Sequence, residues 1–431
     1  MISMKFNRTH YIEDIMLDMK GQEVILGGWV EDLRKMGKMT FLTLRDATAI
    51  IQIILTDDVM KSIDDITRQS VVRVTGKIQD TKARDFECEI KASEISVLAR
   101  AVHPLPIDPI GRLESHIDNR LNSRALDMRN QKTASIFKIR HHVLVSLRKT
   151  FLQQKFTEIT TPKIIGSASE GGANLFSLDY FGKQAYLAQS PQLYKEQMTI
   201  GLERVFEIAS FYRAEKSHTG RHLSEFTSVD MEAAFMDYND VMDVLEDLVL
   251  NTFKHVSENC KTEQEIIGNK VIIPNKPFEK ITYSEALEEL NRKDVKLEFG
   301  DDLLDSHLRV IGENHPGFYF LTDWPIKLKP FYIMENQDKP EISESFDLQF
   351  GYLELSSGGT RLHSPEKIKM RLSEQDLDPT KFSEHLQAFD WGMPPHAGWG
   401  LGLERLLTVI IGIDNVREVI LYPRDPERLK P

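Results

Sequence analysis

Two segments far apart in the chain, residues 213–226 and 398–405, contain residue types that could bind a polyphosphate and a nucleobase. Both carry arginine, which stays charged at physiological pH and binds phosphate oxygens as a planar fork. The second segment also has glycine at every second position, which lets the backbone approach a bulky ligand closely. The chain lacks the sequence G-x-x-x-x-G-K-[ST], which argues against a P-loop ATPase.

The first segment is predicted to form a β-hairpin. An apolar strand over residues 205–213 ends at Arg213, and a polar loop over residues 216–220 turns the chain. Period-two alternation in the returning strand, residues 226–235, places Phe226, Asp230 and Glu232 on one face.

This hairpin could hold a nucleotide. Arg213 would face an α-phosphate, Glu215 and the loop an adenine or a nucleotide end, and His222 a distal phosphate, while the ring of Phe226 would be a stacking platform. An ordinary surface hairpin with salt bridges is the alternative.

The second segment is predicted to be a glycine-rich strand followed by a helix over residues 403–411, with Arg405 in its first turn. Three glycines in one strand cost backbone entropy, so something must require the empty side. A helix amino terminus with an arginine suits an anionic ligand. Tight packing of strand on helix around small residues is the alternative.

The two segments resemble motifs 2 and 3 of class II aminoacyl-tRNA synthetases. Residues 136–165, which end in a strand with Pro162, are similar to motif 1, the dimer-forming helix and strand of that class. The family often has glycine where this chain has Lys155, directly before Phe156. The resemblance implies an α+β catalytic domain, an antiparallel sheet flanked by helices, and a homodimer.

Within this class, the whole chain resembles the aspartate and asparagine branch, specifically aspartyl-tRNA synthetases of the archaeal and eukaryotic type. Four blocks in the family's order carry the resemblance: residues 169–172, 189–195, 346–361 and 392–396. The implied function is ATP-dependent attachment of L-aspartate to tRNA(Asp) through an aspartyl-adenylate. Charging of tRNA(Asn) as well is left open.

A site for aspartate needs cations that an amide could not satisfy equally, and Lys195 and Arg361 supply two. Related asparaginyl enzymes usually have an aliphatic residue at the position of Lys195. The full set that the resemblance implies for aspartate is Glu170, Gln192, Leu193, Tyr194, Lys195, Arg213, Asp230, Ser357 and Arg361.

The resemblance also implies a site for ATP and Mg²⁺. Arg213 and Arg405 are the expected catalytic residues, because they would neutralise phosphate charge while the ionised aspartate α-carboxylate attacks the α-phosphorus. The ATP set is Arg213, Ala214, Glu215, Arg221, His222, Leu223, Phe226, Glu354, Gly402, Leu403, Glu404 and Arg405. The magnesium set is Asp347, Glu354 and Ser357, whose hard oxygens suit that ion.

The amino-terminal region is predicted to be an OB-fold barrel that stacks single-stranded bases. It has five strand-like runs, at residues 23–31, 40–46, 49–55, 70–78 and 86–99, and a helix over residues 57–69. The family resemblance implies anticodon contacts from Arg34, Phe41, Gln52 and Glu89. Without the family, Phe41 would be nearly as well explained as a barrel core residue.

The expected domains are an OB-fold at 1–101, a hinge at 102–134, and a catalytic domain at 135–431 with an insertion at about 258–320. Two cysteines without partner spacing and the lack of a long apolar run predict a cytoplasmic protein with no membrane partner. Because the net charge is −12, local cationic faces must attract tRNA.

Three other functions are weighed. An asparaginyl-tRNA synthetase is the nearest, opposed by Lys195 and Asp230. A tRNA-independent, aspartate-activating ligase is opposed by the anticodon domain, which such paralogues typically lack. A catalytically silent tRNA-binding protein is opposed by the intact Arg213, Glu215, Glu354 and Arg405.

Overall fold

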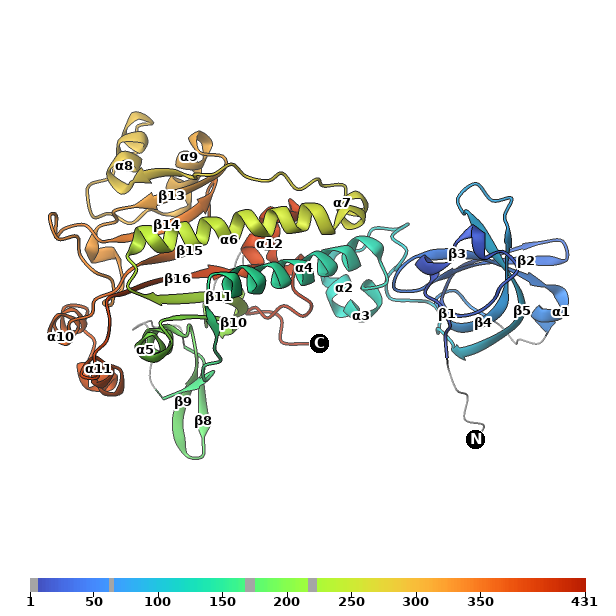
Figure 1. The fold of residues 1–431 in the computed structure, drawn as a ribbon, viewed down its shortest axis with the longest axis horizontal. Helices are drawn as coiled ribbons and strands as arrows, with labels where there is room; N and C mark the ends of the chain where they lie inside the picture. The colour runs from blue at the N-terminus through green and yellow to red at the C-terminus, as the bar shows by residue number, and fades with distance from the viewer. Residues whose placement is uncertain (1–6, 62–65, 167–174, 216–222) are drawn as a thin grey trace. The chain divides into compact units, whose positions relative to one another are not determined.

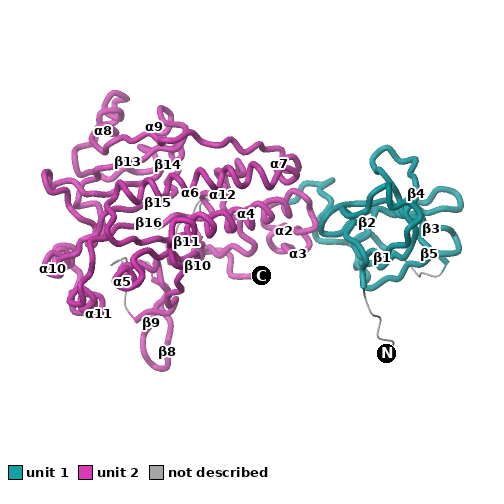
Figure 2. Tube along the Cα trace, in the orientation of Figure 1, with its two compact units in different colours: residues 1–115 teal, residues 116–431 magenta. Residues whose placement is uncertain are grey.

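The structure is a computed structural model that describes residues 7–61, 66–166, 175–215 and 223–431. The chain divides into two compact units, Met1–Ser115 and His116–Pro431 (Figure 2). Each unit has its own hydrophobic core. Within the described residues, no helix combines the length and the apolar character needed to span a membrane.

Unit 1 is the predicted OB-fold, a closed five-stranded barrel in the order β1-β2-β3-β5-β4. Its elements are β1 (Glu23–Met36), β2 (Met39–Arg45), β3 (Ile50–Thr56), α1 (Asp57–Lys61), β4 (Val71–Asp80) and β5 (Cys88–Ala99). The expected helix over residues 57–69 was too long, since residues 66–70 are not helical. The reason is local: Gln69 has φ 66° and donates its backbone N–H to Val30 of β1, which a helix could not do.

Unit 2 is built on an eight-stranded sheet, predicted as antiparallel, whose order is β12-β13-β14-β15-β16-β11-β10-β6 (Figure 1). Two neighbouring pairs depart from that prediction, because β6 runs parallel to β10 and β12 runs parallel to β13. The strands are β6 (Thr157–Glu158), β10 (Arg204–Tyr212), β11 (Glu225–Ala234), β12 (Glu279–Thr282), β13 (Phe318–Thr322), β14 (Ser345–Phe350), β15 (Leu353–Thr360) and β16 (His396–Gly402). A small sheet is formed by β7 (Ile164–Ile165), β9 (Lys183–Leu187) and β8 (Ser177–Tyr180).

Two long helices, α4 (Gln131–Gln153) and α6 (Tyr238–Asn259), pack with α12 (Leu403–Ile411) on the apolar face of the large sheet. Side-chain caps start both long helices, since Asn130 and Asp237 accept bonds from the first free N–H groups. The remaining α-helices are α2 (Ile117–Asn122), α3 (Arg124–Asp127), α5 (Gln192–Leu202), α7 (Lys261–Ile267), α8 (Tyr283–Arg292), α9 (Asp305–Asn314), α10 (Pro365–Glu374) and α11 (Ser383–Phe389).

The turn after α4 forms without the glycine that the family often has. Lys155 adopts φ 63°, a left-handed conformation that favours glycine. The backbone N–H of Phe156 then donates to Phe151 at 3.0 Å, and the two rings pack edge to face in the core. Burial of Phe156 therefore holds the lysine in its unfavourable conformation.

His315 ties together three elements of residues 258–320. Its ring nitrogens lie 2.7 Å from Glu279 Oε2 in β12 and 3.0 Å from Glu289 Oε1 in α8, while His315 itself follows α9. Burial lowers the pKa of His315, but the two carboxylates outweigh it and raise the pKa above the ordinary value. The ion pairs therefore need a protonated histidine.

We predict that the ion pairs of His315 with Glu279 and Glu289 stabilise the protein most in mildly acidic solution. Because the folded-state pKa of His315 is raised, its contribution is present below the unfolded pKa and is lost as pH rises through the folded pKa. His315→Gln should be less stable than the parent by on the order of 1 kcal/mol near pH 6, and by less near pH 9. Denaturant unfolding at both pH values measures this, and a difference that grows with pH would contradict it.

Candidate active site

The strand β11 has two buried faces of opposite character. Val229, Met231 and Ala233 belong to the core beneath the helices, whereas Phe226 and Asp230 line a pocket on the other side of the sheet. This is the period-two alternation that the sequence predicts for residues 226–235. The two faces explain why residues 228–234 of the strand are buried although Asp230 and Glu232 are among them.

The glycines of β16 lie over those carboxylates. Gly398 pairs with Glu232 and Gly400 pairs with Asp230 in the antiparallel ladder. A β-carbon on Gly398 would lie 2.3 Å from Glu232 Oε2, and one on Gly400 would lie 3.2 Å from Asp230 Oδ1. Because Ala397, Trp399 and Leu401 fill the core face, the glycines leave the other face to the acids. The sequence predicted that something must require the empty side of this glycine-rich strand. The carboxylates of Glu232 and Asp230 lie on that side.

Two buried cations share these carboxylates. Lys195, in α5, places its Nζ 2.9 Å from Asp230 Oδ1, 3.5 Å from Glu232 Oε2 and 3.0 Å from the Trp399 carbonyl oxygen. Arg361 donates from Nε and Nη2 to the two oxygens of Glu232, at 2.9 and 3.3 Å. Burial alone would lower the pKa of Arg361, but Glu232 raises it, so the guanidinium remains charged.

A pocket of about 400 Å³ lies in front of this cluster. That volume falls within the range of small-molecule sites, roughly 300 to 1,000 Å³. Its lining combines charged, polar and small residues, among them Gln189, Gln192, Arg213, Glu215, Leu223, Phe226, Asp230, Lys329, Tyr332, Glu354, Ser357, Arg361, Gly402, Glu404 and Arg405.

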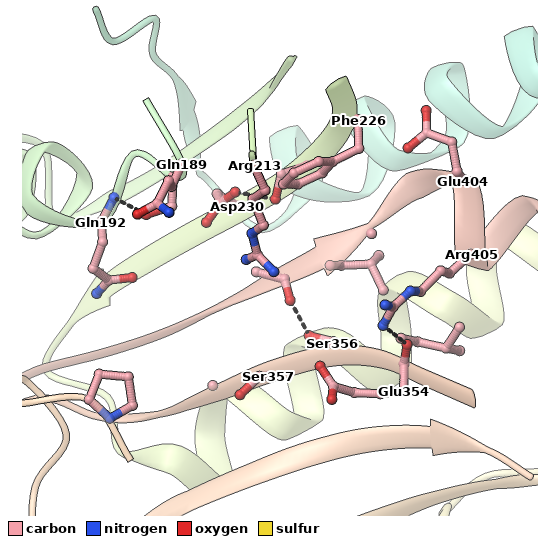
Figure 3. Close-up of a pocket in the computed structure, with 18 of the residues that line it drawn as sticks. Gln189, Gln192, Arg213, Phe226, Asp230, Glu354, Ser356, Ser357, Glu404 and Arg405 are labelled. Atoms are coloured by element: carbon pink, nitrogen blue, oxygen red, sulfur yellow. Dashed lines mark hydrogen bonds between the residues drawn. The ribbon is translucent and has the colours of Figure 1, made fainter. Parts of the chain in front are cut away.

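One end of the pocket carries two arginines and an aromatic ring (Figure 3). Arg213 directly follows β10, is half exposed, and lies with its guanidinium carbon 5.2 Å from the centre of the Phe226 ring. Arg405, in the first turn of α12, donates from Nη1 to the backbone oxygen of Glu354 at 2.7 Å. The two arginines thus approach one cavity from different elements, the end of β10 and the first turn of α12, and this arrangement suits an anionic ligand.

Glu354 and Asp347 lie near each other beside the cavity. Burial and the neighbouring Asp347 raise the pKa of Glu354, against the lowering effect of Arg405, Lys329 and Arg213. Asp347 is buried and is paired with Lys329, whose Nζ lies 3.0 and 3.2 Å from its two oxygens. Two carboxylates in unfavourable proximity, with the Ser357 hydroxyl on the pocket wall, form a set of hard oxygens that a divalent cation would relieve. Within the described part of the chain, no group of three or more His, Cys, Asp or Glu side chains could hold a metal ion.

Not every predicted residue reaches the cavity. Leu193 and Tyr194 pack against neighbouring hydrophobic clusters, and Leu403 belongs to the main core. Glu404 lines the cavity, but its carboxylate is bound by Arg140, at 3.0 Å, and by the Thr227 N–H, at 2.9 Å. Three predicted residues lie outside the residues that the structure describes: Glu170, Arg221 and His222.

The four predicted anticodon residues lie on neighbouring strands of the barrel. Arg34 pairs with Phe41 across β1 and β2, and Gln52 pairs with Glu89 across β3 and β5. Gln52 Nε2 donates to Glu89 Oε2 at 2.6 Å. The core alternative for Phe41 is wrong, because the flanking Leu42 and Leu44 fill the barrel core and Phe41 is partly exposed.

Sequence reasoning missed three residues of the site. Glu232 was placed on the correct face, but its partner Arg361 is far away in the sequence, directly after β15. Lys329 stands in a segment with no recognisable motif. Glu196 had a local signal, because it follows Gln192 by one helical turn and Gln192 Nε2 donates to it at 2.6 Å.

Two family models match the chain. Residues 116–426 match the family described as tRNA synthetases class II (D, K and N). Residues 24–98 match the OB-fold nucleic acid binding domain. The matches fall in unit 2 and unit 1, respectively.

Individual relatives are similar over nearly the full length. The aspartate–tRNA(Asp/Asn) ligase of Methanothermobacter thermautotrophicus is 44% identical over 430 residues, 98% of each chain. The asparaginyl-tRNA synthetase of Pyrococcus horikoshii, solved with asparaginyl-adenylate, is 32% identical with a TM-score of 0.90, covering 98% of this chain and 99% of that one. The aspartyl tRNA synthetase of Entamoeba histolytica is 30% identical with a TM-score of 0.85, covering 98% and 92%.

Proposed function

This chain belongs to the class II tRNA synthetases (D, K and N), and we propose that it uses the pocket of unit 2 to attach L-aspartate to tRNA. The reaction is the ATP-dependent charging of tRNA(Asp) through an aspartyl-adenylate, as the names of its archaeal relatives imply. The observation that carries the choice of aspartate is the buried Lys195, held by Asp230 and Glu232 beside Arg361.

We propose that Arg361 and Lys195 bind the side-chain carboxylate of aspartate. Two of the Arg361 nitrogens donate hydrogen bonds to Glu232, and these bonds fix the plane of the guanidinium. Arg361 also lines the cavity, so the remaining edge of its guanidinium is available to the substrate. Asp230 and the carboxamide of Gln192 line the same cavity and supply acceptors for the α-ammonium group. Asp230 therefore has two roles, since it also binds Lys195.

In the activation step, the α-carboxylate of aspartate attacks the α-phosphorus of ATP. The attacking group is already ionised, so the rate depends on positioning and on stabilisation of phosphate charge. Arg213 is placed to bind the α-phosphate, and Arg405 to bind the departing pyrophosphate. The Phe226 ring would stack on adenine.

We propose that Glu354 and Ser357 hold Mg²⁺, with Asp347 behind them. A magnesium ion held there would neutralise charge on the phosphates of ATP. Because Asp347 is paired with Lys329, its contribution is to the charge of the site, whereas Glu354 and Ser357 line the cavity itself.

In the transfer step, the terminal adenosine hydroxyl of tRNA attacks the adenylate and releases AMP. We place the anticodon on the barrel face of Phe41, where the partly exposed ring can stack on a base. Both M. thermautotrophicus and Methanocaldococcus jannaschii relatives are named for tRNA(Asp/Asn), and we propose that this chain also charges tRNA(Asn). The cytoplasm, where tRNA is charged, is the proposed location.

The function is tested by charging purified tRNA(Asp) and tRNA(Asn) with labelled aspartate and ATP. Attachment of aspartate to both acceptors is expected. Charging of tRNA(Asp) alone would overturn the relaxed specificity, and charging of neither would overturn the proposed function.

Phe41→Ala should separate the two steps of the reaction. Aspartate activation should be unchanged, because the pocket lies wholly within unit 2, whereas charging of tRNA should weaken by the roughly 1 to 3 kcal/mol of one base stack. A chain beginning near Ile107 should show the same split more strongly.

The control for Phe41 is Leu98→Ala, which removes an exposed apolar side chain from β5 of the barrel. Pyrophosphate exchange and tRNA charging are measured side by side for each variant. If a folded Phe41→Ala variant charged tRNA as the parent does, the barrel face would not be the anticodon site.

We also propose that the protein is a homodimer formed through α4 and β6. The strand β6 is the last in the large sheet, and α4 exposes Val145 and Leu152, which are 41% and 63% exposed. An exposed sheet edge beside exposed apolar side chains is typical of a protein–protein interface. Light scattering is expected to give about twice the chain mass of 49.6 kDa. An active monomer at assay concentration would contradict the dimer.

A further inference from the structure

The side chain of Gln192 could present either end of its carboxamide to the pocket, and its neighbour Glu196 decides which. Gln192 begins α5, lines the pocket, and donates from Nε2 to Glu196 Oε1 at 2.6 Å. An ionised carboxylate can only accept, so the nitrogen must face Glu196 and the oxygen is left for the pocket. Figure 3 shows the carboxamide oxygen of Gln192 on the pocket side and the nitrogen turned away.

Glu196 is itself held by two histidines from other elements. Its Oε2 lies 3.5 Å from Nε2 of His385, in α11, and 3.5 Å from Nε2 of His396, in β16. Nδ1 of His396 lies 2.8 Å from the carbonyl oxygen of Pro394, which can only accept, so Nδ1 carries a proton. Nε2 can then donate to Glu196 only if the ring is protonated, and Glu196 does raise the pKa of His396 against the effect of burial.

The carboxylate of Glu196 stays ionised although the residue is fully buried. Burial raises its pKa, but the neighbouring His385 and His396 outweigh burial and hold the pKa well below its ordinary value. A buried ion pair seldom adds net stability over apolar residues of the same size. A network that ends on a residue of the pocket wall therefore points to a role in the site.

We propose that Glu196 is a positioning residue for aspartate binding, which fixes the Gln192 carboxamide with its oxygen toward the α-ammonium group of the substrate. His385 and His396 hold Glu196 in that position from the opposite side. The inference rests on the proposed function, since it assumes that Gln192 faces the bound amino acid.

The test is a double-mutant cycle on the full chain, read by aspartate-dependent pyrophosphate exchange. In Glu196→Gln the new amide can donate as well as accept, so both orientations of Gln192 become possible. The KM for aspartate should rise about tenfold, while kcat at saturating aspartate and the KM for ATP stay close to the parent values. Gln192→Ala should show a similar rise, and the double variant should be no worse than Gln192→Ala alone.

Thr199→Val is the matched control for the packing of α5. Thr199 lies one turn after Glu196 and is equally buried, and its hydroxyl donates to the Glu196 carbonyl and to Met393 Sδ. This variant should keep the parent KM for aspartate. Glu196→Asp, which retains the charge but shortens the side chain, replaces Glu196→Gln if circular dichroism shows that the latter fails to fold, and the same rise in KM is expected.

An unchanged KM for aspartate in a folded Glu196 variant would overturn the inference, and so would a double variant whose losses multiply. These outcomes differ from failure of the proposed function, which would appear as a parent chain without aspartate-dependent exchange. If the parent activated asparagine instead, the same ratios measured with asparagine would decide the inference, because both amino acids share the α-ammonium group.

Discussion

Replacing Lys195 by leucine is expected to remove most of the aspartate activation. Lys195 neutralises Asp230 and Glu232 from 2.9 and 3.5 Å, and it is buried. Without it, two buried carboxylates would repel the incoming aspartate side chain and one would lack a cation. Breaking a buried pair in this way costs roughly 3 to 5 kcal/mol, so kcat/KM for aspartate should fall at least about a hundredfold.

Lys163→Leu is the matched control for Lys195→Leu. Lys163 also pairs with a buried carboxylate, Glu207, at 2.7 Å, but it belongs to the segment that ties β7 to β10. Both variants should lose stability in thermal unfolding, and only Lys195→Leu should lose aspartate-dependent pyrophosphate exchange. A folded Lys195→Leu chain with parental kinetics for aspartate would show that Lys195 is a structural residue.

Arg405→Ala is expected to impair the use of ATP. Arg405 lines the pocket from the first turn of α12. Among the described residues, its guanidinium donates one hydrogen bond, from Nη1 to the Glu354 backbone oxygen at 2.7 Å. A guanidinium that stabilises charge on the reacting phosphates is worth more in the transition state than in the bound substrate. The KM for ATP should rise and kcat should fall, with kcat/KM lower by about 10² or more.

Two further variants sharpen this result. Arg405→Lys keeps the charge but not the planar fork, so it should recover only part of the loss. Arg309→Ala removes an arginine that stacks on Tyr352 in another part of unit 2, and it should leave the KM for ATP unchanged. If Arg405→Ala kept the parental ATP kinetics, the glycine-rich segment would not be part of the nucleotide site.

Local patterns predicted the elements that carry the site. Alternation over residues 226–235 placed Phe226 and Asp230 on one face, and β11 has that arrangement. The predicted helix over residues 403–411 is α12. In both cases, the information lies in neighbouring residues, whose spacing decides which face they share.

The partners of these residues could not be predicted in the same way. Arg361 reaches Glu232 from the residue after β15, and Lys329 reaches Asp347 from a loop, so only the fold brings each pair together. Alternation along β2 likewise separates Phe41 from Leu42 but does not say which of them faces the barrel core. The helix predicted to reach Gln69 ended early because that residue bonds to β1.

The choice between aspartate and asparagine is the point on which the relatives differ. The P. horikoshii asparaginyl-tRNA synthetase is similar over the whole chain at 32% identity, so overall similarity cannot decide the substrate. The decision rests on the charges around the pocket, where Arg361 lines the wall and the buried Lys195 lies behind Asp230. A carboxylate carries a charge that both cations can balance, whereas an amide carries none.

Pyrophosphate exchange with aspartate and with asparagine, measured in parallel on the full chain with ATP and magnesium, tests this account most directly. The buried lysine predicts exchange with aspartate at a kcat/KM at least about a hundredfold above that for asparagine. Exchange with asparagine equal to or greater than that with aspartate would contradict the assignment of Lys195 and Arg361 as the residues that select the substrate.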